Sequence, residues 1–129
     1  MVAFSPTRTP LATRRQIVGQ HMPLKTVEPG TRWPSGDSLV IAELDVSVEW
    51  VSKLFGTQLI EGVEEGLGSW VGIGGQLPSG RPIELVKYQM QDWFQLRADS
   101  ASPIRPVLEE FRKVSAISDS QISWVVPSA

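Results

Sequence analysis

Apolar and polar residues alternate along much of the chain with the two-residue period of a β-strand. Because successive side chains of a strand point to opposite faces of a sheet, such alternation indicates strands with one buried face. Shorter apolar runs, bounded by Gly, Pro, Asn, Asp or Ser, are read in the same way. The pattern predicts strands over residues 39–44, 58–60, 69–77, 82–88, 93–98 and 122–126.

A helical period replaces the alternation near the C-terminus. The apolar residues recur at i, i+3, i+4, i+7 and i+10, which places them on one face of a helix. They are Ile104, Val107, Leu108, Phe111 and Val114. The sequence therefore predicts a helix over residues 104–114.

Residues 46–55 follow two patterns at once. Val48, Val51 and Phe55 fit one helical face, whereas the alternation of the preceding strand continues as far as Trp50. A serine or aspartate before the segment is suited to cap a helix, and a glycine commonly follows one. We expect a helix over residues 46–55, with a strand running on to Val51 as the alternative.

The connections between these elements are short. Pro-Ser-Gly at residues 34–36 and 78–80 is typical of tight turns, and residues 61–68 form an acidic, glycine-rich connection. Consecutive strands joined by short links favour antiparallel pairing. We therefore expect an α+β fold with a single antiparallel sheet of about five or six strands and two helices packed on one face.

Charge divides the chain into two parts. Residues 1–32 carry five basic residues and one acidic residue, a net charge of +4, and are rich in Pro and Thr. Residues 33–129 carry seven basic and thirteen acidic residues, a net charge of −6. We expect a basic, flexible, disordered arm before an acidic α+β domain. A mitochondrial transit peptide and a translation start at Met22 are alternative interpretations of the arm.

Composition argues against several kinds of chemistry. The chain has no cysteine and a single histidine, His21, which lies in the predicted arm. Zinc sites of Cys and His, and a nucleophile activated by histidine, are therefore not expected. The glycine-rich segment 75–82 has Arg and Pro where a phosphate loop has Lys and Ser or Thr. We predict no cofactor, no metal and no enzymatic activity, with a carboxylate-dependent hydrolase, or an accessory subunit of an enzyme, as the alternative.

Five tryptophans are many for 129 residues. Trp124 is expected to pack in the core, whereas Trp70 and Trp93 alternate onto the side of their strands opposite the apolar residues. Exposed tryptophan beside charge is typical of a binding hot spot. The predicted partner-binding residues are Trp70, Trp93, Arg97, Glu61, Glu64 and Glu65.

These features favour a small, non-enzymatic protein-binding module. An acidic domain suits a basic protein partner, as in an immunity protein or an antitoxin that inhibits a nuclease-like toxin. Specific nucleic-acid binding is not expected, because the domain would repel phosphate. No apolar stretch is long enough to span a membrane, and the N-terminus lacks the apolar segment of a secretory signal, so we expect a cytoplasmic protein. A self-associating structural protein, including a homodimer, is a further alternative.

Overall fold

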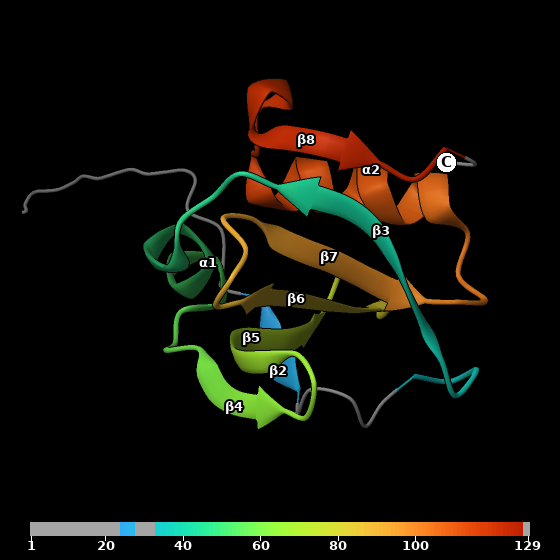
Figure 1. Ribbon diagram of the computed structural model, residues 1–129. Helices are drawn as coiled ribbons and strands as arrows, with labels where there is room; N and C mark the ends of the chain where they lie inside the picture. Colours follow the sequence, from blue (N-terminus) through green and yellow to red (C-terminus); the bar gives the residue numbers. More distant parts are fainter. Residues whose placement is uncertain (1–23, 28–32, 128–129) are drawn as a thin grey trace, which may run out of the picture.

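The computed structural model describes residues 24–27 and 33–127 (Figure 1). Within these residues the chain forms seven strands, two α-helices and one 3₁₀ turn. In chain order the elements are β2 (Lys25–Val27), β3 (Ser38–Leu44), α1 (Val48–Phe55), β4 (Ile60–Glu64), β5 (Gly68–Gln76), β6 (Pro82–Tyr88), β7 (Phe94–Asp99), α2 (Ile104–Ser115), η1 (Asp119–Gln121) and β8 (Ile122–Val125).

All strands pair antiparallel in one sheet, in the order β2-β5-β6-β7-β3-β8, with β4 also paired to β5. β5 is long enough to hold two neighbours on the same side: β4 lies along residues 68–72 and β2 along residues 74–76. Seven strands therefore occupy six positions across the sheet. This arrangement confirms the α+β fold with one antiparallel sheet.

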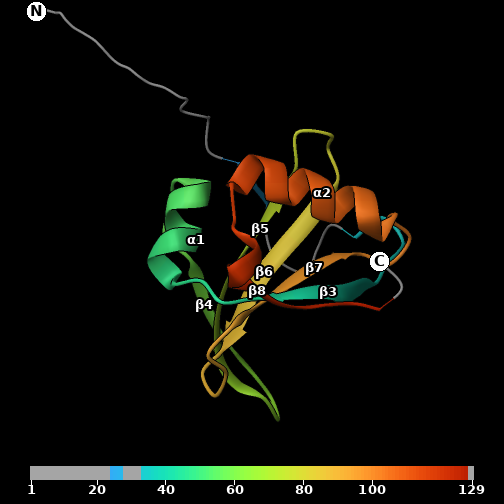
Figure 2. The ribbon, with the colours of Figure 1, turned by 90° about the horizontal axis from the view of Figure 1, so that it is seen from above.

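Both helices pack on one face of the sheet, which we call the helix face (Figure 2). Alternate residues of the central strands point into this core, as the sequence pattern predicts: Ile83 and Leu85 from β6, and Phe94 and Leu96 from β7, are fully buried. Burial of apolar side chains of this size contributes about 1.5–3 kcal/mol each. The core is therefore the main source of stability of the fold.

Local side-chain and backbone chemistry sets the two ends of α1. The hydroxyl of Ser47 accepts a hydrogen bond from the amide of Trp50 and so caps the start of α1. Gly56 adopts a left-handed conformation that ends the helix. Helix α2 buries Val107, Leu108 and Phe111 against the sheet. Neither helix of the described part of the chain is long and apolar enough to cross a bilayer.

Asp99, at the end of β7, fixes the turn that leads into β3. One carboxylate oxygen accepts the Ser35 amide at 2.9 Å and its hydroxyl at 3.0 Å, and the other accepts the Ala101 amide at 3.0 Å. The amide of Ser35 contributes most to holding the pKa of Asp99 below its usual range. The Asp99 carboxylate thus joins two loops while it remains ionised.

One end of the predicted arm belongs to the sheet. Residues 25–27 form β2, paired with β5, and Leu24 is buried in the main core. The amide of Leu24 also donates to the carbonyl of Leu54 at the end of α1. Residues 24–27 of the predicted arm are therefore part of the fold, through three pairings with β5 and one buried leucine. Residues 1–23 and 28–32 of the predicted arm lie outside the described residues.

Two expectations are wrong. The predicted strand 58–60 and connection 61–68 are instead strand β4 and a short turn, so the acidic segment is half of a hairpin. Trp124 is 40% exposed rather than buried. It lies on β8, which pairs only with β3 among the described strands, so one side of the indole has no neighbouring strand to pack against.

Candidate functional site

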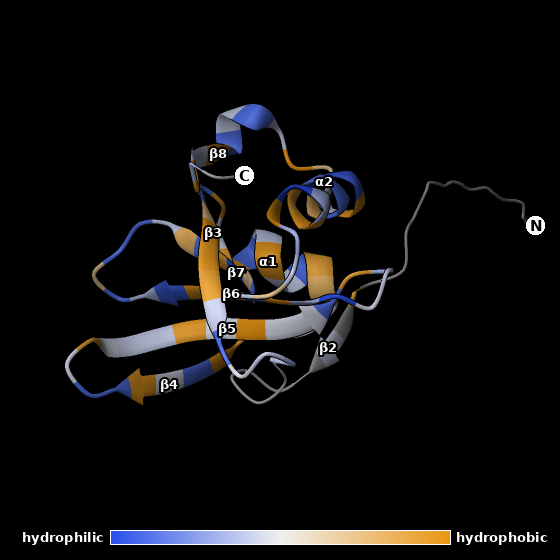
Figure 3. Cartoon of the chain, turned by 90° about the vertical axis from the view of Figure 1, so that its right-hand side faces the viewer, coloured by the Kyte–Doolittle hydropathy of each residue, from blue (hydrophilic) through white to orange (hydrophobic). Residues whose placement is uncertain are grey.

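Four of the six predicted binding residues lie on the β4–β5 hairpin. Glu61 and Glu64 belong to β4, Glu65 to the turn and Trp70 to β5. The hairpin projects beyond both helices, and β4 carries both apolar and hydrophilic residues (Figure 3). Exposed apolar side chains accompany the acids: Val63 is 78% exposed, and Ile60 and Leu67 are each 44% exposed. We call this set, Ile60, Glu61, Val63, Glu64, Glu65 and Leu67, the hairpin surface.

The register of the hairpin sorts its side chains between the two faces of the sheet. Val71 packs against the main core on the helix face, and Glu61 is paired directly with Val71, so Glu61 points to the helix face too. Glu64 lies three residues further along β4 and therefore points to the opposite face, which we call the second face. The side chains of Glu61 and Glu64 thus point to opposite faces of the hairpin, although the two residues are close together in the sequence.

Trp70 fills the space above a glycine on the second face. It pairs directly with Gly62, and a Cβ at position 62 would overlap the indole ring. The ring is half-buried as a result. Trp70 is therefore a structural part of the hairpin that leaves one portion of its surface accessible.

A groove with a volume of about 610 Å³ lies on the helix face beside the hairpin. Val48, the first residue of α1, forms one wall, and Val63 and Val71 contribute further apolar surface. Glu61 and Lys87 add one charge of each sign. The groove exists because α1 covers other parts of the helix face and leaves β4 and the adjoining part of β5 uncovered (Figure 2).

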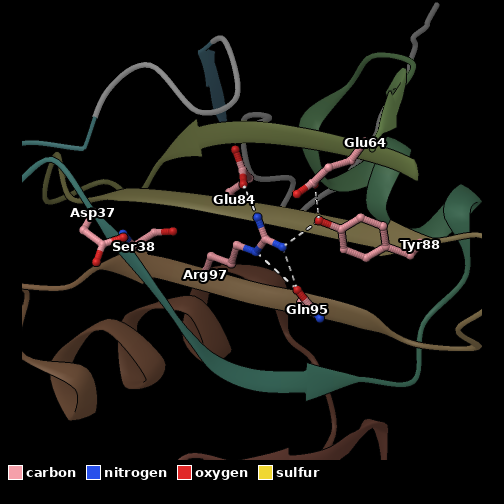
Figure 4. A network of polar contacts seen from close by, with 7 residues as sticks. All are labelled: Asp37, Ser38, Glu64, Glu84, Tyr88, Gln95 and Arg97. Atoms are coloured by element: carbon pink, nitrogen blue, oxygen red, sulfur yellow. Dashed lines mark hydrogen bonds and ion pairs between the residues drawn. The ribbon is translucent and has the colours of Figure 1, made fainter. Parts of the chain in front are cut away.

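A polar network occupies the second face (Figure 4). Its centre is the guanidinium of Arg97 on β7, which donates to Gln95 at 2.8 Å, to the Tyr88 hydroxyl at 3.2 Å and to Glu84 at 3.3 Å. The side chains of Arg97 and Glu84 are 23% and 4% exposed. The predicted binding residue Arg97 is therefore held by internal contacts.

Tyr88 links this network to the hairpin. Its hydroxyl donates to Glu64 at 2.8 Å and accepts from Arg97. Burial raises the pKa of Tyr88, although the hydrogen bond from Arg97 acts in the opposite direction. The phenol therefore stays protonated at neutral pH, as the donor to Glu64 requires. The network fixes the β4–β5 hairpin against the centre of the sheet.

Trp93 is not part of the β4–β5 hairpin. It immediately precedes β7, is half-buried, and its indole N–H is buried without a hydrogen-bond partner in the described part of the chain. Sequence reasoning missed Val48 and Val63 as site residues. The signal was an apolar residue between two acids in a segment read as a loop.

The described residues contain no cluster of three or more His, Asp or Glu side chains arranged to hold a metal ion. Comparison with known proteins adds no candidate chemistry. No family model matches the chain, and neither the curated proteins nor the solved structures contain a match.

Proposed function

We propose that this protein is a small binding module that docks a basic protein partner on its hairpin surface. The observation that supports the proposal most strongly is the combination of Val63, 78% exposed, with three carboxylates on one projecting hairpin. Residues 60–72 contain no lysine or arginine. Exposed apolar residues rimmed by charge are typical of protein interaction sites.

The two kinds of residue have different roles in such an interface. Carboxylates at Glu61, Glu64 and Glu65 attract a basic surface over a distance of about 10 Å at moderate salt and so accelerate association. Apolar contacts at Ile60 and Val63 exclude water and slow dissociation. An immunity protein or antitoxin that covers the basic cleft of a nuclease-like partner requires this combination.

Arg97 has a positioning role in this proposal. Its guanidinium contacts Glu84, Gln95 and Tyr88, and Tyr88 in turn holds Glu64. Loss of Arg97 is therefore expected to lower stability, with an effect on binding only through the position of the hairpin.

Affinity capture from the source cell with matched variants tests the proposal. The full chain, Glu61→Lys and Glu109→Lys are used in parallel at low salt, and retained proteins are quantified by mass spectrometry. Both glutamates are exposed, but Glu109 lies on α2. A partner should be retained by the full chain and by Glu109→Lys, and strongly reduced with Glu61→Lys. Equal retention by both variants would show that the hairpin is not the binding site.

A further inference from the structure

The outer edge of β4 has no strand beside it in the described part of the chain. In an antiparallel ladder, each residue directs its backbone N–H and C=O to the same side, and the direction alternates along the strand. The amide of Gln89 donates to the carbonyl of Ser69, which shows that Ser69 turns its backbone groups toward β6. Ser69 therefore makes no ladder hydrogen bond to β4.

The direction of the Ser69 backbone groups determines which backbone groups of β4 face outward. Val63 is paired with Ser69, and Glu61 with Val71, two residues further along β5. Since these pairs make no ladder hydrogen bonds to each other, the N–H and C=O groups of Glu61 and Val63 point away from β5. Gly62, between them, directs its groups inward to Trp70. Four backbone hydrogen-bonding groups are thus presented at the free edge.

The side chains of the same two residues point to the helix face and border the groove beside Val48. A strand that pairs with Glu61 and Val63 places its own opposing side chains on that face too, because directly opposed residues of a sheet lie on the same side. Backbone pairing and side-chain recognition therefore coincide at two positions. Free edges of sheets are usually protected from pairing with another strand. The edge of β4 differs because it adjoins a groove that can receive the side chains of an added strand.

We propose that the edge of β4 binds an extended segment of another protein as an added antiparallel strand, with a basic residue opposite Glu61 and an apolar residue opposite Val63. The inference rests on the proposed function and specifies how the partner is recognised. Strand addition obtains affinity from main-chain hydrogen bonds and specificity from alternate side chains. A second basic residue in this segment faces Glu64 on the other side of the strand.

Charge favours a different protein over a second copy of this chain. Antiparallel pairing of two β4 strands about Gly62 would bring Glu61, Glu64 and Glu65 of both copies onto one short ribbon, with no basic residue in either hairpin. Glutamates would not be directly opposed in this pairing, but the like charges gathered on one short ribbon repel one another. A basic segment removes the repulsion and replaces it with attraction.

Charge also distinguishes β4 from β8, which lies at the opposite edge of the sheet in the described part of the chain. Beside β8 lies a smaller hollow of about 210 Å³ lined by Arg105, Arg112 and Glu109. Because Arg112 is paired with Asp119, Glu109 and Arg105 leave this hollow without the excess of negative charge found at β4. Binding at β8 is therefore an outcome that the experiment must be able to detect.

The probe is a capped pentapeptide, Lys-Val-Thr-Lys-Val, whose order follows from antiparallel pairing. Its residues lie, in turn, opposite Glu64, Val63, Gly62, Glu61 and Ile60. A short peptide of this kind is expected to bind with a Kd of about 1 mM, which is measurable by NMR titration of the isotope-labelled full chain. The amide resonances of Glu61 and Val63 should shift on binding. Their exchange with solvent should slow by at most about threefold, whereas the amide of Gly62 changes little.

Two N-methylated peptides test the backbone pairing without any change to the protein. Methylation of the valine opposite Val63 removes a donor that the added strand needs, and binding should weaken about tenfold or more. Methylation of the threonine opposite Gly62 alters a group that faces away from β4 and should leave binding unchanged. Equal binding of the two methylated peptides would overturn strand addition.

A matched pair of protein variants gives the reciprocal test. Val63→Pro removes the outward N–H at an edge position, where proline is tolerated because no ladder bond is lost. Val63→Ala retains the N–H and loses only the apolar side chain. Val63→Pro should bind the peptide much more weakly than Val63→Ala, with both variants showing dispersed spectra of a folded protein.

The outcomes separate this inference from the proposed function. Shifts confined to β8, or no saturable shift up to the solubility limit of the peptide, overturn strand addition at β4. If a captured partner is lost with Glu61→Lys but binds Val63→Pro as well as Val63→Ala, the hairpin surface is the binding site and the added strand is wrong. If capture is insensitive to Glu61→Lys, the proposed function itself fails.

Discussion

Arg97→Met removes the centre of the second-face network while it keeps an unbranched apolar side chain of similar length. Glu84 is almost fully buried, and its ion pair with Arg97 spans 3.3 Å. Removal of one partner of a buried ion pair costs about 3–5 kcal/mol, because the remaining charge is left in a poorly solvated place. The Arg97 side chain is 23% exposed, so solvent moderates this cost. We expect a loss of about 2–3 kcal/mol in the free energy of unfolding.

Urea denaturation followed by tryptophan fluorescence measures this loss. With a slope of about 2 kcal/mol per molar urea, the midpoint should fall by about 1–1.5 M. The double variant Arg97→Met with Glu84→Gln separates loss of contacts from the buried charge. Because glutamine carries no charge, the double variant should be more stable than Arg97→Met alone by about 1 kcal/mol.

The reasoning is wrong if Arg97→Met costs less than about 0.5 kcal/mol, a value typical of an exposed pair. It is also wrong if Glu84→Gln destabilises the Arg97→Met background as much as it destabilises the unchanged chain. Either result would mean that Arg97 is not the main compensation of the Glu84 carboxylate.

Three further predictions concern the fold. Phe111→Ala should lower the free energy of unfolding by about 3–5 kcal/mol in a urea titration, because the ring is buried in the main core. A chain beginning at Trp33 should melt at a lower temperature than one beginning at Met22, because it lacks Leu24 and β2; equal melting would contradict this. The stability advantage of the unchanged chain over Asp99→Asn should be present at neutral pH and decrease as pH falls below about 4, because folding lowers the pKa of Asp99. A pH-independent difference in chemical denaturation would refute that assignment.

The central elements were predictable because burial leaves a strong pattern in the sequence. The β6 and β7 strands have one face in the core, so Ile83, Leu85, Phe94 and Leu96 alternate with polar residues. Helix α2 shows its stripe for the same reason. The serine that caps α1, Ser47, was also predictable, because its hydroxyl suits that position.

The edges were not predictable in this way. Strand β4 buries almost nothing, so its sequence carries no alternation, and its acids and glycines resemble a loop. Its conformation is decided by pairing with β5, which no local pattern records. β2 is only three residues long and depends on the same strand. Local propensity is a weak guide wherever tertiary pairing decides the structure.

The sequence predicts only part of the candidate site. Four of the six predicted binding residues lie on one hairpin, because these acids and the aromatic residue are close together in the sequence. The assignment of Glu61 and Glu64 to opposite faces requires the strand to be known. The engagement of Arg97 by Glu84 and Tyr88 depends on the pairing of β6 with β7, and it changes the role expected for that arginine.

The rates of binding to a captured partner, measured by surface plasmon resonance at two salt concentrations, test the central claim most directly. Replacement of Glu61, Glu64 and Glu65 by glutamine should lower the association rate and flatten its salt dependence, with little change in dissociation. Val63→Ala should instead accelerate dissociation, with a loss of about 1–2 kcal/mol in binding free energy. If neither variant changes either rate while both remain folded, the hairpin surface is not the binding site and the account is contradicted.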